Sequence, residues 1–230
     1  LVPEPASLTS TSAPKPPART FTHIYIQIVL PALWILFFGL LLWCLRGRGR
    51  LAGRRDLIGL TLTTALALGL RLWLPDHGAA DISNTFYSVY GGAEQLQDFG
   101  HYGRGVEGLL LPLLQIFPYA DDTLVWTNVL LGVASVPLMY ALVRRLGYRA
   151  LTGHTAALFL AIAPLHVRFT PTTNRYIALI FLCLAAWVLL LAFIEEGRWR
   201  DLLAATVALI LAPQCRPEAA AIPVVTLALV

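Results

Sequence analysis

The residues best suited to chemistry fall in two polar segments that separate long apolar runs. The first segment, residues 75–123, holds seven carboxylates, among them Asp76 and Asp81. A carboxylate just beyond a membrane-spanning helix could take a proton from an acceptor hydroxyl, so Asp81 is a candidate general base. Asp81 could equally cap a helix that begins near Asn84, which requires no chemistry. Both interpretations stay open.

Oxygen ligands in the same segment make a divalent cation a candidate cofactor. Asp76, Asp81 and Asn84 could together hold a hard ion such as Mg²⁺ or Mn²⁺, because these ions prefer oxygen ligands. Their spacing matches no defined metal-binding loop. Asp76 taken alone is more typical of a solvated loop residue.

The second polar segment runs from Ala163 to Tyr176 and joins two apolar runs. Arg168 and Arg175 lie in it, and two arginines at a membrane surface favour a phosphate site, since guanidinium groups bind phosphate oxygens through paired donors. The alternative is that both arginines contact lipid headgroups. His166 is more typical of a hydrogen-bonding loop residue than of a metal ligand, because no partner stands at ligand spacing.

The rest of the chain must position these segments in a membrane. Of the 230 residues, 57% are hydrophobic and only 13% are charged, whereas soluble domains carry about 25% charged residues. Apolar runs of about 17–22 residues are long enough to span the hydrocarbon, and lipid leaves the backbone no partner but itself. We therefore predict an all-α, polytopic transmembrane bundle. The predicted spans cover residues 24–45, 57–74, 124–143, 151–167 and 176–194.

Two regions do not fit a simple span. Residues 202–212 and 219–230 are each too short to cross alone, and Pro213 to Glu218 interrupt them, so we expect a broken or half-spanning helix pair that lines a cavity. Within the long polar segment, residues 86–96 and 106–117 have helical character. We expect short helices there, the second lying on the membrane interface.

Arginines beside the apolar runs predict the orientation. Five arginines lie within residues 46–55, and Arg144, Arg145 and Arg149 follow a later span. Cytoplasmic loops are enriched in Lys and Arg, so we place these loops in the cytoplasm. The N-terminus and residues 75–123 then lie on the other side of the cytoplasmic (inner) membrane. The net charge of +4 reflects this topology, and we expect no nucleic-acid partner.

We divide the chain into three parts. Residues 1–20 are rich in Pro, Ser and Thr and are expected to be a disordered tail. Residues 21–56 form the first span with its basic loop, and residues 57–230 form the main transmembrane region. Because the sequence stops inside an apolar run, we expect a C-terminal portion to be missing. Three cysteines at unrelated spacings predict neither a disulfide framework nor a metal set.

Over about residues 57–225, the order of these features resembles the GT-C superfamily. These are polytopic glycosyltransferases that use polyprenyl-phosphate-linked sugars, and they include protein O-mannosyltransferases and the aminoarabinose transferases of lipid A. The Pro164-Leu165-His166 stretch followed by Arg175 is similar to the family's "SPLH…YSREARMY" segment. The other similar features are Arg71 near the end of a span, Asp81, Arg144-Arg145-Leu146-Gly147 and Arg216-Pro217-Glu218. Taken by itself, Arg71 is more typical of a snorkelling residue.

The resemblance implies that Asp81 is the catalytic base and that Arg175 contacts the donor phosphate. We therefore predict an inverting transferase that moves a hexose or pentose from a polyprenyl-phosphate donor to an acceptor on the non-cytoplasmic side. Its partners would be the lipid-linked sugar and membrane lipids. The other candidate substrate-binding residues are Arg168, His166, Tyr176, Asp76 and Arg104.

Two other functions stay open. The chain could be a non-catalytic scaffold subunit of a larger membrane complex, and the absence of a second acid directly after Asp81 favours this. It could also be a transporter, because broken helices and buried charges such as Arg216 and Glu218 are typical of that class.

Overall fold

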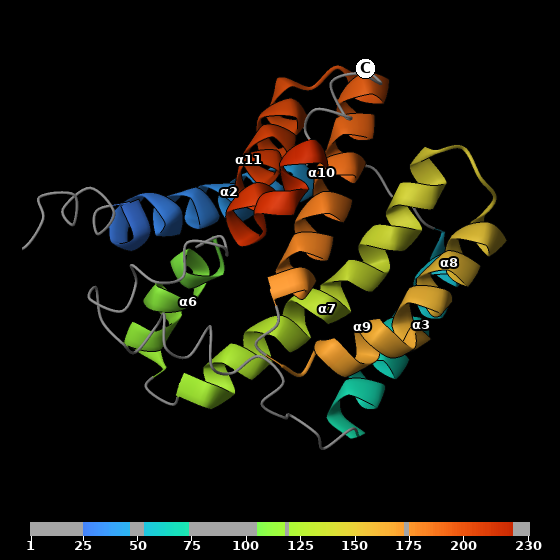
Figure 1. The fold of residues 1–230 in the computed structure, drawn as a ribbon. Helices are drawn as coiled ribbons and strands as arrows, with labels where there is room; N and C mark the ends of the chain where they lie inside the picture. Colours follow the sequence, from blue (N-terminus) through green and yellow to red (C-terminus); the bar gives the residue numbers. More distant parts are fainter. Residues whose placement is uncertain (1–24, 47–52, 74–104, 118–119, 173–174, 223–230) are drawn as a thin grey trace, which may run out of the picture.

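The structure is a computed structural model, and it describes residues 25–46, 53–73, 105–117, 120–172 and 175–222. Within these ranges every regular element is a helix (Figure 1), which confirms the predicted all-α fold. The elements are η1 (Tyr25–Val29), α2 (Leu30–Arg46), α3 (Arg54–Trp73), α6 (Gly105–Ile116), α7 (Ala120–Arg145), α8 (Ala150–Ile162), α9 (Pro164–Phe169), α10 (Arg175–Glu196), α11 (Trp199–Cys215) and η2 (Pro217–Ala220).

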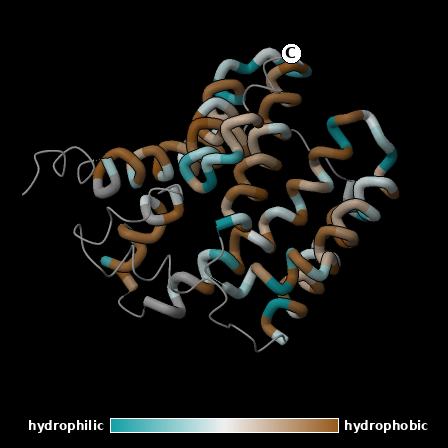
Figure 2. The backbone as a smooth tube through the Cα atoms, viewed as in Figure 1, coloured by the Kyte–Doolittle hydropathy of each residue, from teal (hydrophilic) through white to brown (hydrophobic). Residues whose placement is uncertain are grey.

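The helices include several that are suited to a membrane. Those long and apolar enough to cross it lie at Arg55–Trp73 in α3, Val125–Arg145 in α7 and Arg175–Glu196 in α10. Shorter apolar helices cover Leu30–Leu45 and Ala150–Ile162. Figure 2 shows hydrophobic residues over most of the length of the helices and hydrophilic ones mainly near their ends. The chain is therefore a multi-pass membrane protein.

Proline divides the span predicted at residues 151–167. Ala163 has φ −55° and ψ 119°, outside the helical region, because the residue before a proline is pushed away from the α conformation. α8 therefore ends at Ile162, and α9 begins at Pro164, where a proline is well tolerated. The prediction of one continuous helix here is wrong, and the division turns the chain into a separate short helix at the membrane boundary.

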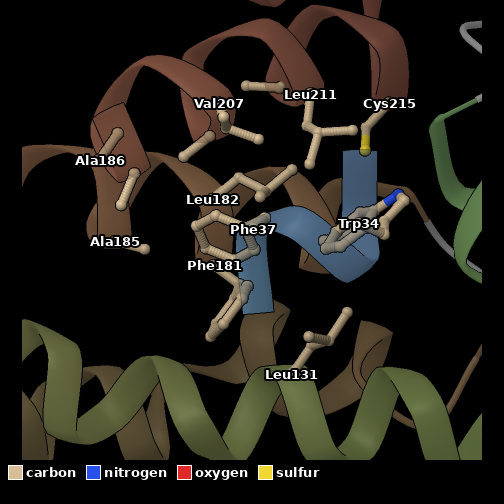
Figure 3. Close-up of a cluster of buried hydrophobic side chains, with 14 of the residues drawn as sticks. Trp34, Phe37, Leu131, Phe181, Leu182, Ala185, Ala186, Val207, Leu211 and Cys215 are labelled. Atoms are coloured by element: carbon tan, nitrogen blue, oxygen red, sulfur yellow. The ribbon is translucent and has the colours of Figure 1, made fainter. Parts of the chain in front are cut away.

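The hydrophobic core is centred on α10, which lies between α7 and α11 (Figure 1). Of its apolar span, 61% is buried. Phe181 and Leu182 of α10 pack with Phe37 of α2 and Leu211 of α11 (Figure 3). Alanines at the contact between α10 and α11 let the two backbones approach closely, as is common between membrane helices. These alanines are Ala185, Ala186, Ala204, Ala205 and Ala208.

The apolar surface of α3 faces away from the core. Only 11% of its span is buried, and the exposed side chains include Leu62, Leu66 and Trp73. A large exposed apolar face on one helix marks a surface made for a nonpolar environment. We therefore assign this face of α3 to lipid.

The predicted interfacial helix is present as α6, but its first half belongs to the core. Val106 and Leu110 are buried, and the indole nitrogen of Trp34 in α2 donates a hydrogen bond to the Gly105 carbonyl at 2.7 Å. Gly108 lies so close to Leu30 that no Cβ would fit there. α6 therefore packs against α2 along its N-terminal half, while Ile116 at its other end is exposed.

The break predicted over Pro213 to Glu218 lies within that range. α11 continues through Pro213 to Cys215, and Arg216 then takes an extended conformation with φ −149° and ψ 118° before the short helix η2. The interruption is confirmed, and Arg216 lies at the break itself.

The helix ends that flank the arginine-rich stretches of the sequence lie together at one end of the bundle. Arg145 forms ion pairs with both Glu195 and Glu196, which joins the ends of α7 and α10. At the starts of α3 and α8, a carboxylate oxygen of Asp56 lies 3.6 Å from His154 Nε2. The end of α2 meets the start of α11 through a Trp43–Trp199 contact. The helices therefore alternate in direction as predicted. We call this the basic end and the opposite one the site end.

Candidate functional site

The polar segment between α8 and α10 forms a folded corner at the site end. Residues 163–172, which we call the corner segment, consist of α9 and the turn after it. The Thr170 hydroxyl donates a hydrogen bond to the His166 carbonyl, and the Thr172 hydroxyl donates to the Phe169 carbonyl at 2.6 Å. Hydrogen bonds from Thr side chains to nearby backbone stabilise such turns. The segment predicted as a basic loop is thus largely ordered by its own side chains.

Helix α7 holds the corner segment in place. The side-chain nitrogen of Asn128 donates to the Thr172 carbonyl, and a Cβ built on Gly132 would lie 2.5 Å from Thr170 Cγ2. Asn128 and Gly132 are four residues apart and so share one face of the helix. An amide donor and a missing side chain on that face therefore allow the corner to approach α7 closely.

The chain leaves the corner and enters α10 at a cluster of cationic and aromatic side chains. Arg175, the first residue of α10, is only 6% exposed, whereas Tyr176 is 44% exposed. The guanidinium carbon of Arg216 lies 3.9 Å from the centre of the Tyr176 ring, a cation–π contact. We call these three residues the arginine–tyrosine cluster. Guanidinium groups beside a helix N-terminus suit a phosphate, because both favour negative charge.

The other two predicted site residues of the corner segment, His166 and Arg168, differ in how far their side chains are exposed. His166 is 5% exposed and lies on α9, while Arg168 on the same helix is exposed. Arg168 and Arg175 were predicted as a pair at one surface loop, but one is exposed and the other buried. Only Arg175 is held in a fixed, enclosed position.

Several predicted site residues lie outside the residues that the structure describes. These are Asp76, Asp81, Asn84 and Arg104. The general base and the candidate cation ligands therefore stay predictions. Among the described residues, no three His, Cys, Asp or Glu side chains come together as a metal site.

Arg71 lies in the last turn of α3, a place typical of a snorkelling arginine, but its side chain does not snorkel. It is fully buried instead of reaching toward water. Its Nη1 donates to the Ala67 carbonyl at 2.7 Å and to the Ala161 carbonyl at 3.2 Å, and its Nη2 lies 2.5 Å from His166 Nδ1. Arg71 thus connects the ends of α3 and α8 to α9. Ala161 and His166 lie 90 and 95 residues away along the chain, so no local sequence signal indicates these two contacts.

The contact with Arg71 defines the protonation state of His166. Burial, with a further contribution from the positive charge of Arg71, lowers the pKa of His166 to about 4. The imidazole is therefore neutral at pH 7. Because a guanidinium can only donate, Nδ1 of His166 must accept the hydrogen bond, and the ring proton resides on Nε2.

An apolar cavity of about 410 Å³ opens between α2, α6, α7 and α10. Phe181 in its wall follows Arg175 by six residues, about 9 Å along the axis of α10, and Thr127 in the same wall directly precedes Asn128. The cavity thus approaches the site end along α7 and α10. A space of this size with apolar walls suits a hydrocarbon chain. Its lining includes Trp34, Phe38, Leu109, Leu130, Leu131 and Phe181.

The fold is that of a multi-pass helical membrane protein. At its site end, the arginine–tyrosine cluster lies at the start of α10, and the apolar cavity lies further along the same helix. The sequence model of the dolichyl-phosphate-mannose-protein mannosyltransferase family matches residues 110–230, more than half of the chain. The chain belongs to this family, which is of the GT-C type of membrane glycosyltransferases. The predicted GT-C resemblance is therefore confirmed. No curated protein and no solved structure matches the chain.

The matched region contains the residues that organise the site end. It includes the corner segment and the whole arginine–tyrosine cluster, whereas Arg71 and Asp81 precede it. The family assignment therefore bears on the residues of α7 to α11 and leaves the roles of individual side chains open.

Proposed function

We propose that this protein transfers a sugar from a polyprenyl-phosphate donor to an acceptor on the non-cytoplasmic side of the cytoplasmic membrane. The observation that carries the proposal is the joint position of the arginine–tyrosine cluster and the apolar cavity along α10. α10 carries buried Arg175 in its first turn and, about 9 Å further along its axis, Phe181 in the wall of the apolar cavity. A lipid-linked phosphate has a part for each, a phosphate for the arginine and a hydrocarbon chain for the cavity.

The proposed reaction is a single displacement. Asp81 removes the proton of an acceptor hydroxyl, and the resulting oxygen nucleophile attacks the anomeric carbon of the donor sugar. The bond between that carbon and the phosphate oxygen breaks, and the lipid phosphate leaves with the electron pair. Arg175, with Arg168 nearby in the chain, stabilises the negative charge that develops on the leaving phosphate. Attack from the opposite side inverts the anomeric configuration.

The remaining predicted contacts surround this centre. Tyr176 is placed by its contact with Arg216, and His166 is placed by its contact with Arg71. We retain both as substrate-binding residues, together with Asp76 and Arg104. The basic end would face the cytoplasm under the positive-inside rule, which places the site end outside.

Transfer of radiolabelled mannose from dolichyl-phosphate mannose in proteoliposomes tests the proposal. We expect Arg175→Ala to lower the rate at limiting donor by about tenfold to a hundredfold, since it removes a hydrogen bond to a charged group. Arg149→Ala is the matched control, because Arg149 is exposed at the basic end and should leave the rate unchanged.

Asp81→Asn separates chemistry from binding. The variant should lose transfer while its affinity for dolichyl phosphate is unchanged, because the amide cannot accept the acceptor's proton. Wild-type rates in both Asp81→Asn and Arg175→Ala would refute the reaction. Purification of the protein in a complex of fixed stoichiometry without transfer activity would favour the scaffold function instead.

A further inference from the structure

Arg71 is a buried cation whose contacts leave its charge uncompensated among the described residues. It is 0% exposed, and its guanidinium contacts two backbone carbonyls and one imidazole. The ion pairs found in the described part of the chain do not include it. A buried charge without a counter-charge is costly, so an anion that reached this position would be bound favourably.

His166 presents a donor at the same place. Its Nδ1 accepts from Arg71, which leaves Nε2 as the protonated nitrogen. Nε2 is buried and has no hydrogen-bond partner among the described residues, and the Nε of Arg71 is in the same state. Buried polar groups in folded proteins are nearly always hydrogen-bonded, so the unpartnered Nε2–H of His166, in contact with a buried cation, indicates a ligand that accepts hydrogen bonds.

The surroundings indicate that the ligand is attached to a lipid. The neighbours of the pair along the chain are apolar and exposed: Trp73 is 83% exposed and Leu165 is 69% exposed. Trp73 follows Arg71 in the last turn of the spanning helix α3, and Leu165 precedes His166 in the short helix α9, so the pair lies at a helix end, where lipid headgroups are expected. A phosphate group carried by a lipid fits this position and the donor of His166.

We propose that Arg71 and His166 form an anion subsite for a lipid-linked phosphate. His166 Nε2–H donates to a phosphate oxygen, while Arg71 supplies the charge and fixes the imidazole tautomer. The subsite rests on the proposed glycosyltransferase function in taking a polyprenyl phosphate as the ligand.

Two substitutions of His166 distinguish ligand binding from a purely structural role. In His166→Gln, the amide nitrogen stands near the position of Nε2 and can donate to the phosphate. In His166→Asn, the amide oxygen stands near Nδ1 and can accept from Arg71, but no donor is left at the position of Nε2. The two variants therefore each keep one of the two functions of the ring.

Equilibrium binding of radiolabelled dolichyl phosphate to the purified protein in detergent gives the readout. We expect His166→Gln to bind within about threefold of wild type and His166→Asn to bind about tenfold to a hundredfold more weakly, the effect of one hydrogen bond to a charged group. The reverse order would show that His166 serves only as the acceptor for Arg71. Wild-type binding in both variants would also overturn the subsite.

Competitors identify the source of the phosphate. Unlabelled dolichyl phosphate should displace the label, whereas dolichol, inorganic phosphate and phosphatidylglycerol at the same concentration should not. Equal displacement by phosphatidylglycerol would assign the pair to bulk lipid headgroups and overturn the proposal, as would equal displacement by dolichol.

The Arg175→Ala variant separates this inference from the proposed function. If His166→Asn weakens binding and Arg175→Ala does not, the subsite stands, and the placement of the donor phosphate at Arg175 fails. If Arg175→Ala weakens binding and both His166 variants bind as wild type, the subsite fails alone. Absence of dolichyl phosphate binding in the wild type would refute both.

Discussion

The close approach of α7 to the corner segment makes Gly132→Ala an informative perturbation. A Cβ at position 132 would lie 2.5 Å from Cγ2 and 2.8 Å from the hydroxyl oxygen of Thr170. Ordinary contacts between carbon atoms are about 3.5–4.0 Å, so α7 or the corner must move by about 1 Å. Overpacking of this kind costs about 1–3 kcal/mol.

Gly69→Ala is the matched control for this substitution. Gly69 also lies inside a helix, but a Cβ at that position meets nothing within 4 Å. Replacing glycine by alanine within a helix gains about 1 kcal/mol in either case, and this gain cancels when the two variants are compared. We therefore expect Gly132→Ala to be less stable than Gly69→Ala by about 1–3 kcal/mol.

Thermal unfolding in detergent measures this difference. For a chain of this size, about 1 kcal/mol corresponds to roughly 2–4 °C in Tm, so Gly132→Ala should unfold roughly 2–12 °C below Gly69→Ala. Donor binding should weaken in Gly132→Ala only, because Thr170 and Thr172 lead directly into Arg175. Equal Tm values for the two variants would refute the reasoning that the corner is seated on α7 at Gly132.

Three further perturbations follow from the contacts. Trp34→Phe removes the buried hydrogen bond to the Gly105 carbonyl and should cost about 0.5–1.5 kcal/mol in thermal unfolding. Trp73→Phe, at a position 83% exposed, should cost below about 0.5 kcal/mol, and equal losses would contradict the role of that hydrogen bond. Arg145→Met should cost about 1 kcal/mol, since it leaves Glu195 without Arg145 at the basic end and removes one of the two arginine partners of Glu196, which also pairs with Arg198; a wild-type Tm would show that these ion pairs contribute nothing. Finally, Tm should fall as the pH drops from about 6.5 to about 4, because in that window the His166 side chain binds a proton in the unfolded chain but not in its buried position in the folded one. His166→Asn should reduce this dependence of Tm on pH. An unchanged dependence would mean that His166 is not the group responsible.

Periodicity and hydropathy predicted the helices well because lipid leaves the backbone no alternative to internal hydrogen bonds. The runs that became α3, α7 and α10 are long and uniformly apolar, so their ends were predicted within four residues. The run over residues 151–167 is equally apolar, and its division at Pro164 depends on backbone geometry that hydropathy does not register.

The site was predicted less completely, because its contacts join residues that are distant in sequence. Arg71 and His166 are separated by 95 positions, and an arginine in the last turn of a helix has the same local sequence whether it points to water or into the bundle. The contact between Tyr176 and Arg216 likewise depends on how α10 and α11 pair. In contrast, Arg175 could be proposed from sequence, because its neighbours in the chain carry the family resemblance.

The most direct test of the central claim is an experimental structure of the protein with dolichyl phosphate bound. We expect the phosphate at the site end, within hydrogen-bond distance of the Arg175 guanidinium, and the hydrocarbon chain in the cavity beside Phe181. A phosphate bound at the basic end, beside Arg145 or Arg149, with the cavity filled by side chains, would contradict the proposed function.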